Sequence, residues 1–411
     1  MSDVPASARH RRVLVVGAGP VGLSSALALR AEGLAVTVLE AGPAGRLRPG
    51  SRAIFVHRQS LLHLEHARPG LGWEIAAHGL VWSTKRTFWG ERQVYERTYQ
   101  PPDPAVLPHS TNLTQVATER LLLDACAAAG VTFEWGSEVV TADSSPDGVR
   151  LTTAAGDAWT ADYVVAADGA RSALRRALGI LMEGGRSESS FVIVDVAEDE
   201  AAPRLPERVF YYGHPAVGHR NVLLVPFAGG WRADLQCRPG DDPDDFSDGE
   251  GVRRWIARVL APGYSDRITW VSTYRFLQVV ADRFTDANRR VLLVGEAGHL
   301  FAPFGARGMN SGIADAVAAA TAVGTALEAS SAKDATAAVD EFAATRRAAA
   351  LYNRNAARLA LDHMQARDVR VRAKRAAAAV VARAGQKAGA WLDAAPYGPR
   401  AGSRGGPSGT Y

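Results

Sequence analysis

The sequence contains little cysteine, and the cysteines present are poorly placed for cross-linking or metal binding. Cys126 and Cys237 are the two cysteines among 411 residues, and neither belongs to a CxxC or Cys/His pattern. This argues against a disulfide framework and against a structural zinc site. We therefore expect no metal centre.

Long apolar runs are also missing. No uninterrupted apolar stretch approaches the roughly 18 residues of a membrane-spanning helix, and the N-terminal segment MSDVPASARHRR lacks the apolar core of a signal peptide. We expect a cytoplasmic protein with no membrane partner.

Lysine is scarce as well, so the 47 basic residues are almost all arginine. The basic residues are scattered along the chain, except near its C-terminus, and do not form the footprint of a nucleic-acid-binding protein. We expect no nucleic-acid partner. The four lysines are Lys85, Lys333, Lys374 and Lys387.

The remaining composition is that of a soluble globular protein, with 47% hydrophobic and 22% charged residues. A chain of this length can bury a large core and is expected to divide into two lobes.

The strongest single motif lies near the N-terminus. An apolar strand, Val13 to Val16, leads into GAGPVG, in which Gly17, Gly19, Pro20 and Gly22 form a tight turn before a helix. Gly17 permits the turn, Gly19 lets the backbone approach a pyrophosphate, and Gly22 lets the helix lie close to the sheet.

A second strand follows this helix and ends in Glu40, where an acid accepts hydrogen bonds from a ribose 2′-hydroxyl. Strand, glycine turn, helix and terminal acid together predict a dinucleotide site; the alternative is a glycine-rich turn without a ligand. Arg46, Arg48 and Arg52 in the next loop are candidates to neutralise the pyrophosphate, or form a solvated basic loop.

The segment Trp73 to Tyr99 alternates aromatic and polar residues, and we place it on a second sheet. Its rings form cross-strand pairs, and some of them are candidates to wall a pocket for a flat ligand. The chain then returns to the first lobe with a capped helix from about Leu113 to Ala129. Gln115, near its start, contacts a cofactor or is a surface residue.

Two later segments repeat the pattern of a buried strand followed by a polar turn. Tyr163 to Ala167 precedes Asp168 and Gly169, which places a carboxylate at the carboxyl edge of a parallel sheet. Val291 to Val294 precedes Glu296, a loop at Pro303, and a helix that begins near Asn310. The start of this helix, with Gly305, Arg307 and Gly308 around it, predicts a positive pocket for an anion.

Between these two segments, residues 191–238 read as successive strands of an antiparallel sheet. Residues 334–392 are rich in alanine and arginine and predict long outer helices, and the tail from Pro396 is expected to be disordered.

These three signals, GAGPVG with Glu40, ADGARS, and GEAGH with PFGARGMN, resemble the class A flavoprotein aromatic hydroxylases typified by para-hydroxybenzoate hydroxylase. The similarity extends to about Arg347. It implies an α/β fold: a Rossmann-like FAD-binding domain (1–72, 100–178 and 280–330), a second antiparallel-sheet substrate domain (73–99 and 179–279) and C-terminal helices (331–395), before the tail (396–411).

The resemblance also implies roles for individual residues. Gly17, Gly19, Pro20 and Gly22 would hold the FAD pyrophosphate, and Glu40 its adenosine ribose. The other implied cofactor contacts are Arg52 at the diphosphate, Gln115 near the ribityl chain, the Asp168–Gly169 pair, Glu296 where the family usually has Asp, and Gly308, Met309 and Asn310 beneath the flavin. Gly298 replaces the usual Ala.

The reaction implied by the resemblance is hydroxylation of a phenolic or polycyclic aromatic small molecule. NAD(P)H reduces the FAD, dioxygen forms the C4a-hydroperoxide, and Pro303 shapes the loop over the ring. Baeyer–Villiger insertion or epoxidation is the nearest alternative, and a noncatalytic nucleotide-binding scaffold is the alternative of another class. The protein is expected to be a monomer or homodimer.

A base that deprotonates a phenol would complete this site, and His57 is one candidate, although a loop histidine is commonly structural. Arg232 and Asp234 share one face of a strand. They point at flavin or substrate, or form an ordinary salt bridge.

Overall fold

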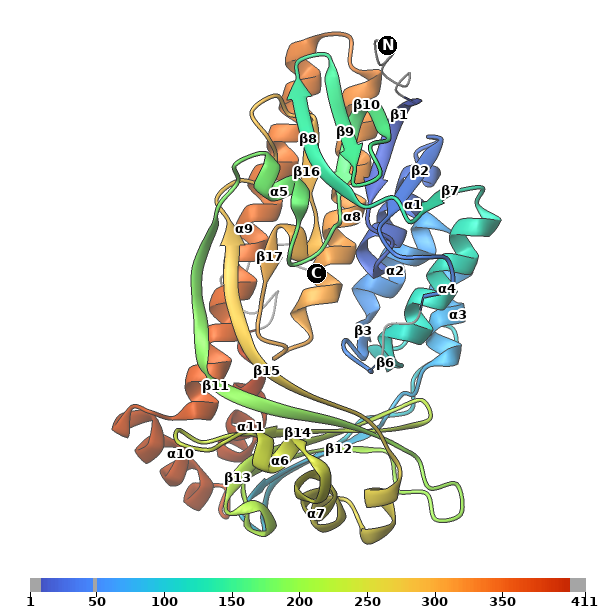
Figure 1. Cartoon of the computed structure of the whole chain (residues 1–411). Helices are drawn as coiled ribbons and strands as arrows, with labels where there is room; N and C mark the ends of the chain where they lie inside the picture. Colours follow the sequence, from blue (N-terminus) through green and yellow to red (C-terminus); the bar gives the residue numbers. More distant parts are fainter. Residues whose placement is uncertain (1–8, 47–49, 400–411) are drawn as a thin grey trace.

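The computed structural model describes residues 9–46 and 50–399, which form two large sheets with helices around them. The first lobe contains a seven-stranded sheet in the order β7-β2-β1-β10-β9-β8, with β16 beside β10 (Figure 1). Its strand pairs are parallel except those of β9, which runs antiparallel to both β10 and β8. The strands are β1 (Arg9–Val16), β2 (Val36–Glu40), β7 (Thr132–Trp135), β8 (Val139–Ser145), β9 (Gly148–Thr153), β10 (Ala158–Ala166) and β16 (Val291–Leu293).

The helices of the first lobe pack against this sheet because its central strands are apolar on both faces. Val13, Leu14 and Val15 of β1 are fully buried, as expected of a parallel strand covered on each side. The helices are α1 (Pro20–Ala31), α2 (Arg58–Ala67), α3 (Leu71–His78), α4 (Gln115–Ala128), α5 (Ala173–Ala177) and α8 (Arg307–Glu328), with the small pair β3 (Phe55–His57) and β6 (Ser110–Asn112) and the short element η3 (Gly295–Ala297). The two-residue strand β17 (His299–Leu300) follows η3 but belongs to the second sheet.

The second lobe contains an eight-stranded sheet in the order β17-β15-β11-β14-β13-β12-β4-β5. Its pairs are antiparallel except β4 with β12, which run parallel. The long strands β11 and β15 arch between the lobes (Figure 1). The strands are β4 (Thr84–Trp89), β5 (Arg92–Thr98), β11 (Met182–Ala197), β12 (Glu207–His214), β13 (Arg220–Phe227), β14 (Gly230–Gln236) and β15 (Ile268–Ala281).

One face of the second sheet is covered by α7 (Gly249–Val259), whose Trp255 and Ile256 pack on Val194, Leu224 and Leu235. These strand residues alternate with residues that face the first lobe. The rest of this lobe is α6 (Asp244–Ser247), η1 (Pro215–Val217) and η2 (Pro262–Asp266).

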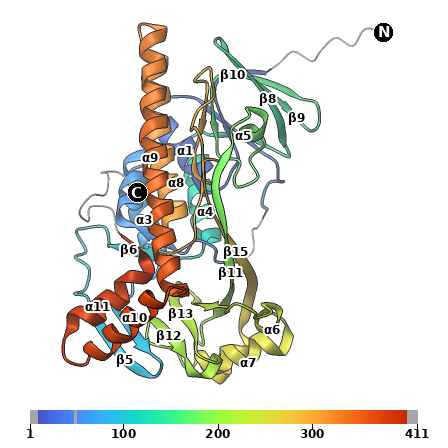
Figure 2. The ribbon, with the colours of Figure 1, turned by 90° about the vertical axis from the view of Figure 1, so that its left-hand side faces the viewer.

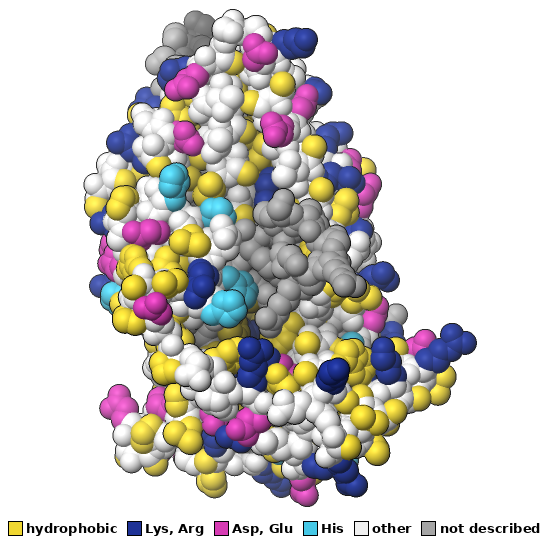
Figure 3. Space-filling view, turned by 180° about the vertical axis from the view of Figure 1, so that it is seen from behind, with side chains coloured by type: hydrophobic (Ala, Val, Ile, Leu, Met, Phe, Trp, Pro, Cys, Tyr) yellow, Lys and Arg dark blue, Asp and Glu magenta, His cyan; other side chains and the backbone are white. Residues whose placement is uncertain are grey.

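The C-terminal helices connect the two lobes. The 34-residue helix α9 (Ala332–Gln365) runs along both (Figure 2), a length of about 50 Å at 1.5 Å per residue. It is followed by α10 (Val369–Val381), α11 (Gln386–Ala394) and η4 (Ala395–Tyr397), which pack at the β5 edge of the second sheet. From behind, basic and hydrophobic side chains lie next to each other where α10 and α11 project (Figure 3).

A buried histidine fixes this contact between the C-terminal helices and the sheet. His363 of α9 lies 2.7 Å from the Tyr212 hydroxyl of β12, which donates to the Leu392 carbonyl at 2.6 Å. Burial, aided by the charges of Arg375 and Lys374, lowers the pKa of His363 to about 4. The imidazole is therefore neutral at neutral pH.

The fold class predicted from the sequence is confirmed, but three segments differ from their predictions. Residues 73–78 are not part of the second sheet: they belong to α3 of the first lobe, which buries Leu71 and Ile75 at helical spacing. The predicted strand from Tyr163 to Ala167 is the second half of a longer strand, β10, which begins at Ala158 and ends at Ala166. Pro396 is buried in η4 rather than beginning a tail, and residues 400–411 lie outside the described part.

Candidate active site

A cavity of about 1230 Å³ lies between the two lobes, lined by loops of the first and by strands of the second. It is the place where the three nucleotide-site signals converge. Aromatic rings aside, fourteen of the residues singled out in the sequence line it: Gly19, Pro20, Arg52, His57, Gln115, Gly169, Arg232, Asp234, Glu296, Pro303, Gly305, Arg307, Gly308 and Met309. Five other predicted residues do not line the cavity: Gly17, Gly22, Glu40, Asp168 and Asn310.

The glycines of the first turn are required by close packing. Gly17 has φ +103°, and a Cβ on it would lie 2.5 Å from the Ala167 carbonyl oxygen. A Cβ on Gly22 would overlap the Gly17 carbonyl. The helix α1 therefore begins against the sheet, with Gly19 as its N-cap and no side chain to satisfy its first N–H groups. These groups are available to an anion in the cavity.

Glu40 holds this turn in place through hydrogen bonds to the backbone. Its carboxylate accepts from the backbone N–H of Ala18 at 2.6 Å and of Gly42 at 2.8 Å, and pairs with Arg46 at 2.7 Å. Arg46 thus neutralises Glu40 and does not line the cavity. Arg48 lies outside the described residues.

Asp168 and Gly169 follow β10 at the carboxyl edge of the parallel sheet, as predicted. Asp168 accepts from the N–H of Leu174 at 3.1 Å, at the start of α5. Burial raises its pKa above the ordinary value, although hydrogen bonds to its carboxylate oppose the shift. Gly169 has φ +77° and open space on its Cβ side, so the backbone here meets the cavity directly.

The GEAGH segment is held by a buried ion cluster that the sequence did not predict. Asp315 of α8 accepts from Arg346 at 2.6 Å, from His299 at 2.8 Å and from the N–H of Gly295 at 3.0 Å. All three bonds are buried, so η3 is fixed to α8 and α9. Glu296, between these anchors, is exposed to the cavity.

Gly298, which replaces the usual Ala of the family, is explained by its contact with a neighbouring aromatic ring. A Cβ on Gly298 would lie 3.1 Å from the Phe284 ring. Phe284 is fully buried, so this side of the segment is filled.

The first turn of α8 is the second helix start that opens into the cavity. Its N-cap, Ala306, adopts φ 54° and provides no side-chain cap. Gly308 lines the cavity with nothing within 4 Å of a built Cβ. The positive end of a 22-residue helix therefore points into open space.

The side chains around this turn have structural partners. Asn310 is buried and accepts from the N–H of His57 at 2.9 Å and from Ser60 at 2.7 Å. Arg307 is also buried and donates to Asn353 and to the Tyr397 carbonyl. Any contact of Asn310 or Arg307 with a flavin is therefore through the helix start rather than through the end of the side chain.

Arg232 links the lobes. Its Nε donates to Asp234 at 2.8 Å along the same strand, and its guanidinium donates to the Arg52 carbonyl. Burial acts to lower the pKa of Arg232, but the charges of Asp234 and Asp195 outweigh it and raise the pKa. Of the two readings left open by the sequence, the structure shows a salt bridge, and one that faces the cavity.

Gln115 lies at the first turn of α4, whose Thr114 caps it by accepting from Ala117 at 3.2 Å. Its amide donates to Glu119 at 2.7 Å. His57, at the start of α2, has its Nε2 3.3 Å from the Gly305 carbonyl. Since a carbonyl only accepts, Nε2 carries the proton in this contact, and Nδ1 is the atom that could act as a base.

The second sheet adds aromatic residues that sequence reasoning largely missed. Phe191, Phe276 and Phe304 form a cluster with ring centroids 5.0–5.7 Å apart, next to Pro303. Of the rings considered between 73 and 99, Trp82 and Tyr99 line the cavity and the others do not. The sequence signal that could have identified Phe191 and Phe276 is the alternation of inward- and outward-facing residues along β11 and β15.

FAD fits these residues. Two uncapped helix starts suit a diphosphate and an anionic ring edge, and the open Cβ positions of Gly169 and Gly308 leave room for a ligand against the backbone. Within residues 9–46 and 50–399, no group of three His, Cys, Asp or Glu residues could hold a metal ion. No helix in this part is both long and apolar enough to cross a membrane.

Comparison with known proteins gives the same assignment. The family model described as an FAD binding domain matches residues 10–354. The chain is 33% identical over 331 residues to 6-methylpretetramide 4-monooxygenase of Streptomyces rimosus, covering 76% of this chain and 55% of that protein. It is 28% identical over 335 residues to 3-(3-hydroxy-phenyl)propionate/3-hydroxycinnamic acid hydroxylase of Klebsiella pneumoniae, covering 76% and 56%.

The chain thus spans about half the length of the curated relatives it matches. Among solved structures, p-nitrophenol 4-monooxygenase of Pseudomonas putida superposes with a TM-score of 0.76 at 25% identity, covering 95% of this chain and 100% of that one.

Proposed function

Because the chain belongs to the family of FAD-binding monooxygenases that includes the class A aromatic hydroxylases, we propose that it hydroxylates a phenolic or polycyclic aromatic small molecule, using FAD, NAD(P)H and dioxygen. The observation that carries the proposal is that both uncapped helix starts open into one cavity, which continues onto an aromatic sheet face. The relatives named as monooxygenase and hydroxylase support the reaction class.

The proposed cofactor contacts follow the cavity wall. The start of α1, at Gly19 and Pro20, holds the diphosphate, while Glu40 shapes this turn and accepts from the adenosine ribose. Arg52, Gln115, Gly169 and Glu296 lie along the remaining length of the cofactor. Bound FAD, once reduced by NAD(P)H, supplies the activation of dioxygen.

The chain's own residues contribute charge and exclude water. The start of α8, at Gly308 and Met309, stabilises negative charge on the cofactor's ring. Pro303 and Phe304 shape the loop beside it, and the phenylalanine cluster keeps this part of the cavity apolar.

His57 and Arg232 have positioning roles in this proposal. His57 braces the Gly305 loop and Arg232 braces the Arg52 loop. If His57 Nδ1 is instead the base, His57→Gln removes the ascending limb of the pH profile of kcat/KM. If His57 only positions the loop, the limb remains and flavin affinity falls.

The test begins with the purified protein, which should be yellow with flavin absorbance. Phenols and polyketide-like aromatics are then screened for stimulation of NAD(P)H oxidation, and products are identified by mass spectrometry. A product with one added oxygen on an aromatic carbon is expected. Oxygen inserted beside a carbonyl would indicate Baeyer–Villiger chemistry, and a colourless protein that cannot be reconstituted with FAD would indicate a noncatalytic scaffold.

A further inference from the structure

Three cations lie side by side on the cavity face of the second sheet. Lys85 of β4 is paired in register with Arg97 of β5 and with Arg208 of β12. Residues paired across strands point to the same face, and all three line the cavity. We refer to Lys85, Arg97 and Arg208 as the cation row.

One carboxylate serves this row. Asp393 of α11 accepts from Lys85, from Arg208 at 2.9 Å and from the Thr87 hydroxyl at 3.0 Å. Lys85, Arg208 and Asp393 are all buried, and Lys85 is the one buried lysine of the four in the chain. Arg97 makes no ion pair with the described residues and stacks on Tyr99 at 4.6 Å. The row therefore has an excess of positive charge.

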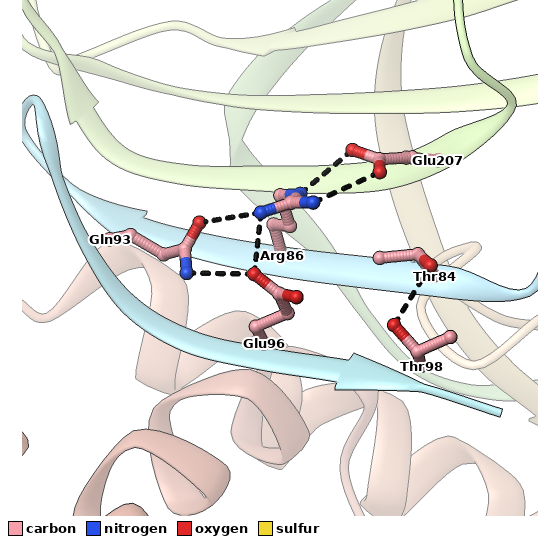
Figure 4. A network of polar contacts seen from close by, with 6 residues as sticks. All are labelled: Thr84, Arg86, Gln93, Glu96, Thr98 and Glu207. Carbon is pink, nitrogen blue, oxygen red and sulfur yellow. Dashed lines mark hydrogen bonds and ion pairs between the residues drawn. The ribbon is translucent and has the colours of Figure 1, made fainter.

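The opposite face of the same strand shows how the chain balances a cation where no ligand is expected. Arg86 lies between Glu207, at 2.8 Å, and Glu96, at 2.5 Å, with Gln93 completing the network (Figure 4). Thus one arginine there has two carboxylates, whereas on the cavity face three cations share one.

The protein does not satisfy every hydrogen-bond donor of the row. The Nε of Arg208 is buried without a hydrogen-bond partner, although a buried donor ordinarily has one. The Arg208 guanidinium stacks on the Tyr397 ring at 4.7 Å, while the Tyr397 carbonyl accepts from Arg307 at the start of α8. Tyr397 therefore connects the cation row to the cofactor end of the cavity.

We propose that the cation row binds a carboxylate carried by the aromatic substrate, whose ring lies among Phe191, Phe276 and Phe304. This inference rests on the proposed function, because it concerns the substrate of the same cavity. A carboxylate at Lys85 and Arg208 would offset one of the two excess charges and provide an acceptor for the Arg208 Nε. It would also fix which ring carbon faces the start of α8.

The test compares an acid with its ester. Anthraquinone-2-carboxylic acid and 3-hydroxy-2-naphthoic acid are titrated, each beside its methyl ester, into the purified protein, with tryptophan fluorescence and calorimetry as readouts. Wild type should bind the acids at least about tenfold more tightly, as expected for a charge-assisted contact worth about 1.4 kcal/mol or more. Equal binding of acid and ester would overturn the proposal.

Lys85→Met is the informative variant, because it removes one of the two excess positive charges and leaves the ion pair of Arg208 with Asp393 in place. The acid-to-ester preference should fall to threefold or less, while Lys333→Met, an exposed lysine on α9, should keep the wild-type value. An unchanged preference in Lys85→Met refutes the role of the row. If that variant does not fold, Arg97→Gln tests the same point, with a smaller loss of preference expected.

The outcomes separate this inference from the proposed function. Acid preference in a protein that holds no flavin leaves the carboxylate site standing and removes the monooxygenase. A protein that contains flavin and oxidises NAD(P)H but shows no acid preference supports the monooxygenase and overturns the carboxylate site. If Lys85→Met instead changes the discrimination between NADPH and NADH and leaves the acid preference intact, the row belongs to the nucleotide's phosphate and the proposal is wrong.

Discussion

Substitution of Asp315 by Asn should destabilise the protein strongly, because it breaks the buried cluster that anchors the GEAGH segment. The two carboxylate oxygens accept from three donors, on Arg346, His299 and Gly295. An Asn has one acceptor oxygen, so its NH₂ group would face at least one of these donors. Loss of one partner from a buried ion pair costs about 3–5 kcal/mol.

The assay is urea unfolding followed by circular dichroism, with Asp340→Asn as the matched control. Asp340 also forms an ion pair from α9, with Arg289 at 3.0 Å, but both side chains are 40% or more exposed. Such pairs contribute about 0–1 kcal/mol. If Asp315→Asn costs no more than this control, the cluster does not stabilise the fold as argued.

The pH dependence provides a second check on the same residue. Burial alone would raise the pKa of Asp315, but the charges of Arg346 and His299 outweigh it and lower the pKa. The stabilisation is therefore present above the unfolded-state pKa of about 3.9 and is lost as the pH falls through the lower, folded value. Asp315→Asn should remove this acid-side loss, and an unchanged acid limb would contradict the assignment.

Three further outcomes follow from single contacts. The pKa of His363 is about 4 in the folded protein and 6.5 in the unfolded chain, so between these values the unfolded chain is protonated and the folded protein is not. The free energy of unfolding should therefore fall by roughly 3 kcal/mol from pH 7 to pH 4. His363→Gln should reduce this pH dependence in urea unfolding experiments. Gly308→Leu should fold but copurify without flavin, whereas Gly324→Ala on the same helix should keep a wild-type flavin-to-protein absorbance ratio. Glu40→Gln loses the ion pair with Arg46. Because a hydrogen bond to a charged group contributes about 1.5–3 kcal/mol, this variant should bind FAD at least about tenfold more weakly. A calorimetric Kd equal to that of the wild type would contradict this prediction.

The parts predictable from the sequence were those set by local geometry. The turn needs glycine at positions 17 and 22 because any side chain there would overlap backbone atoms. The buried strands are recognisable in the sequence as continuous apolar runs. Their carboxyl ends must meet at one edge, so the convergence of Gly19, Gly169 and Glu296 on one cavity could be expected before the structure was known.

Features that depend on long-range register were not predictable in this way. Lys85 and Arg208 are neighbours because β4 adds to the sheet parallel to β12, 123 positions away in the chain. The helix α3 was mistaken for part of this sheet because Trp73 continues an aromatic-rich stretch, although Leu71 and Ile75 have helical spacing. Likewise, no local pattern indicates that Asp315 pairs with His299 and Arg346.

The proposed substrate end of the cavity also depends on residues that follow the family match, which ends at 354. Asp393 holds the cation row, and the Tyr397 ring stacks on Arg208, whereas the contact of Tyr397 with Arg307 is made by its backbone. Tyr397→Ala should therefore weaken aromatic acid binding by about 2- to 30-fold, the loss expected of a cation–π contact of about 0.5–2 kcal/mol, and leave the flavin content unchanged. Equal losses of flavin and of acid binding would show that this segment supports the whole cavity rather than its substrate end.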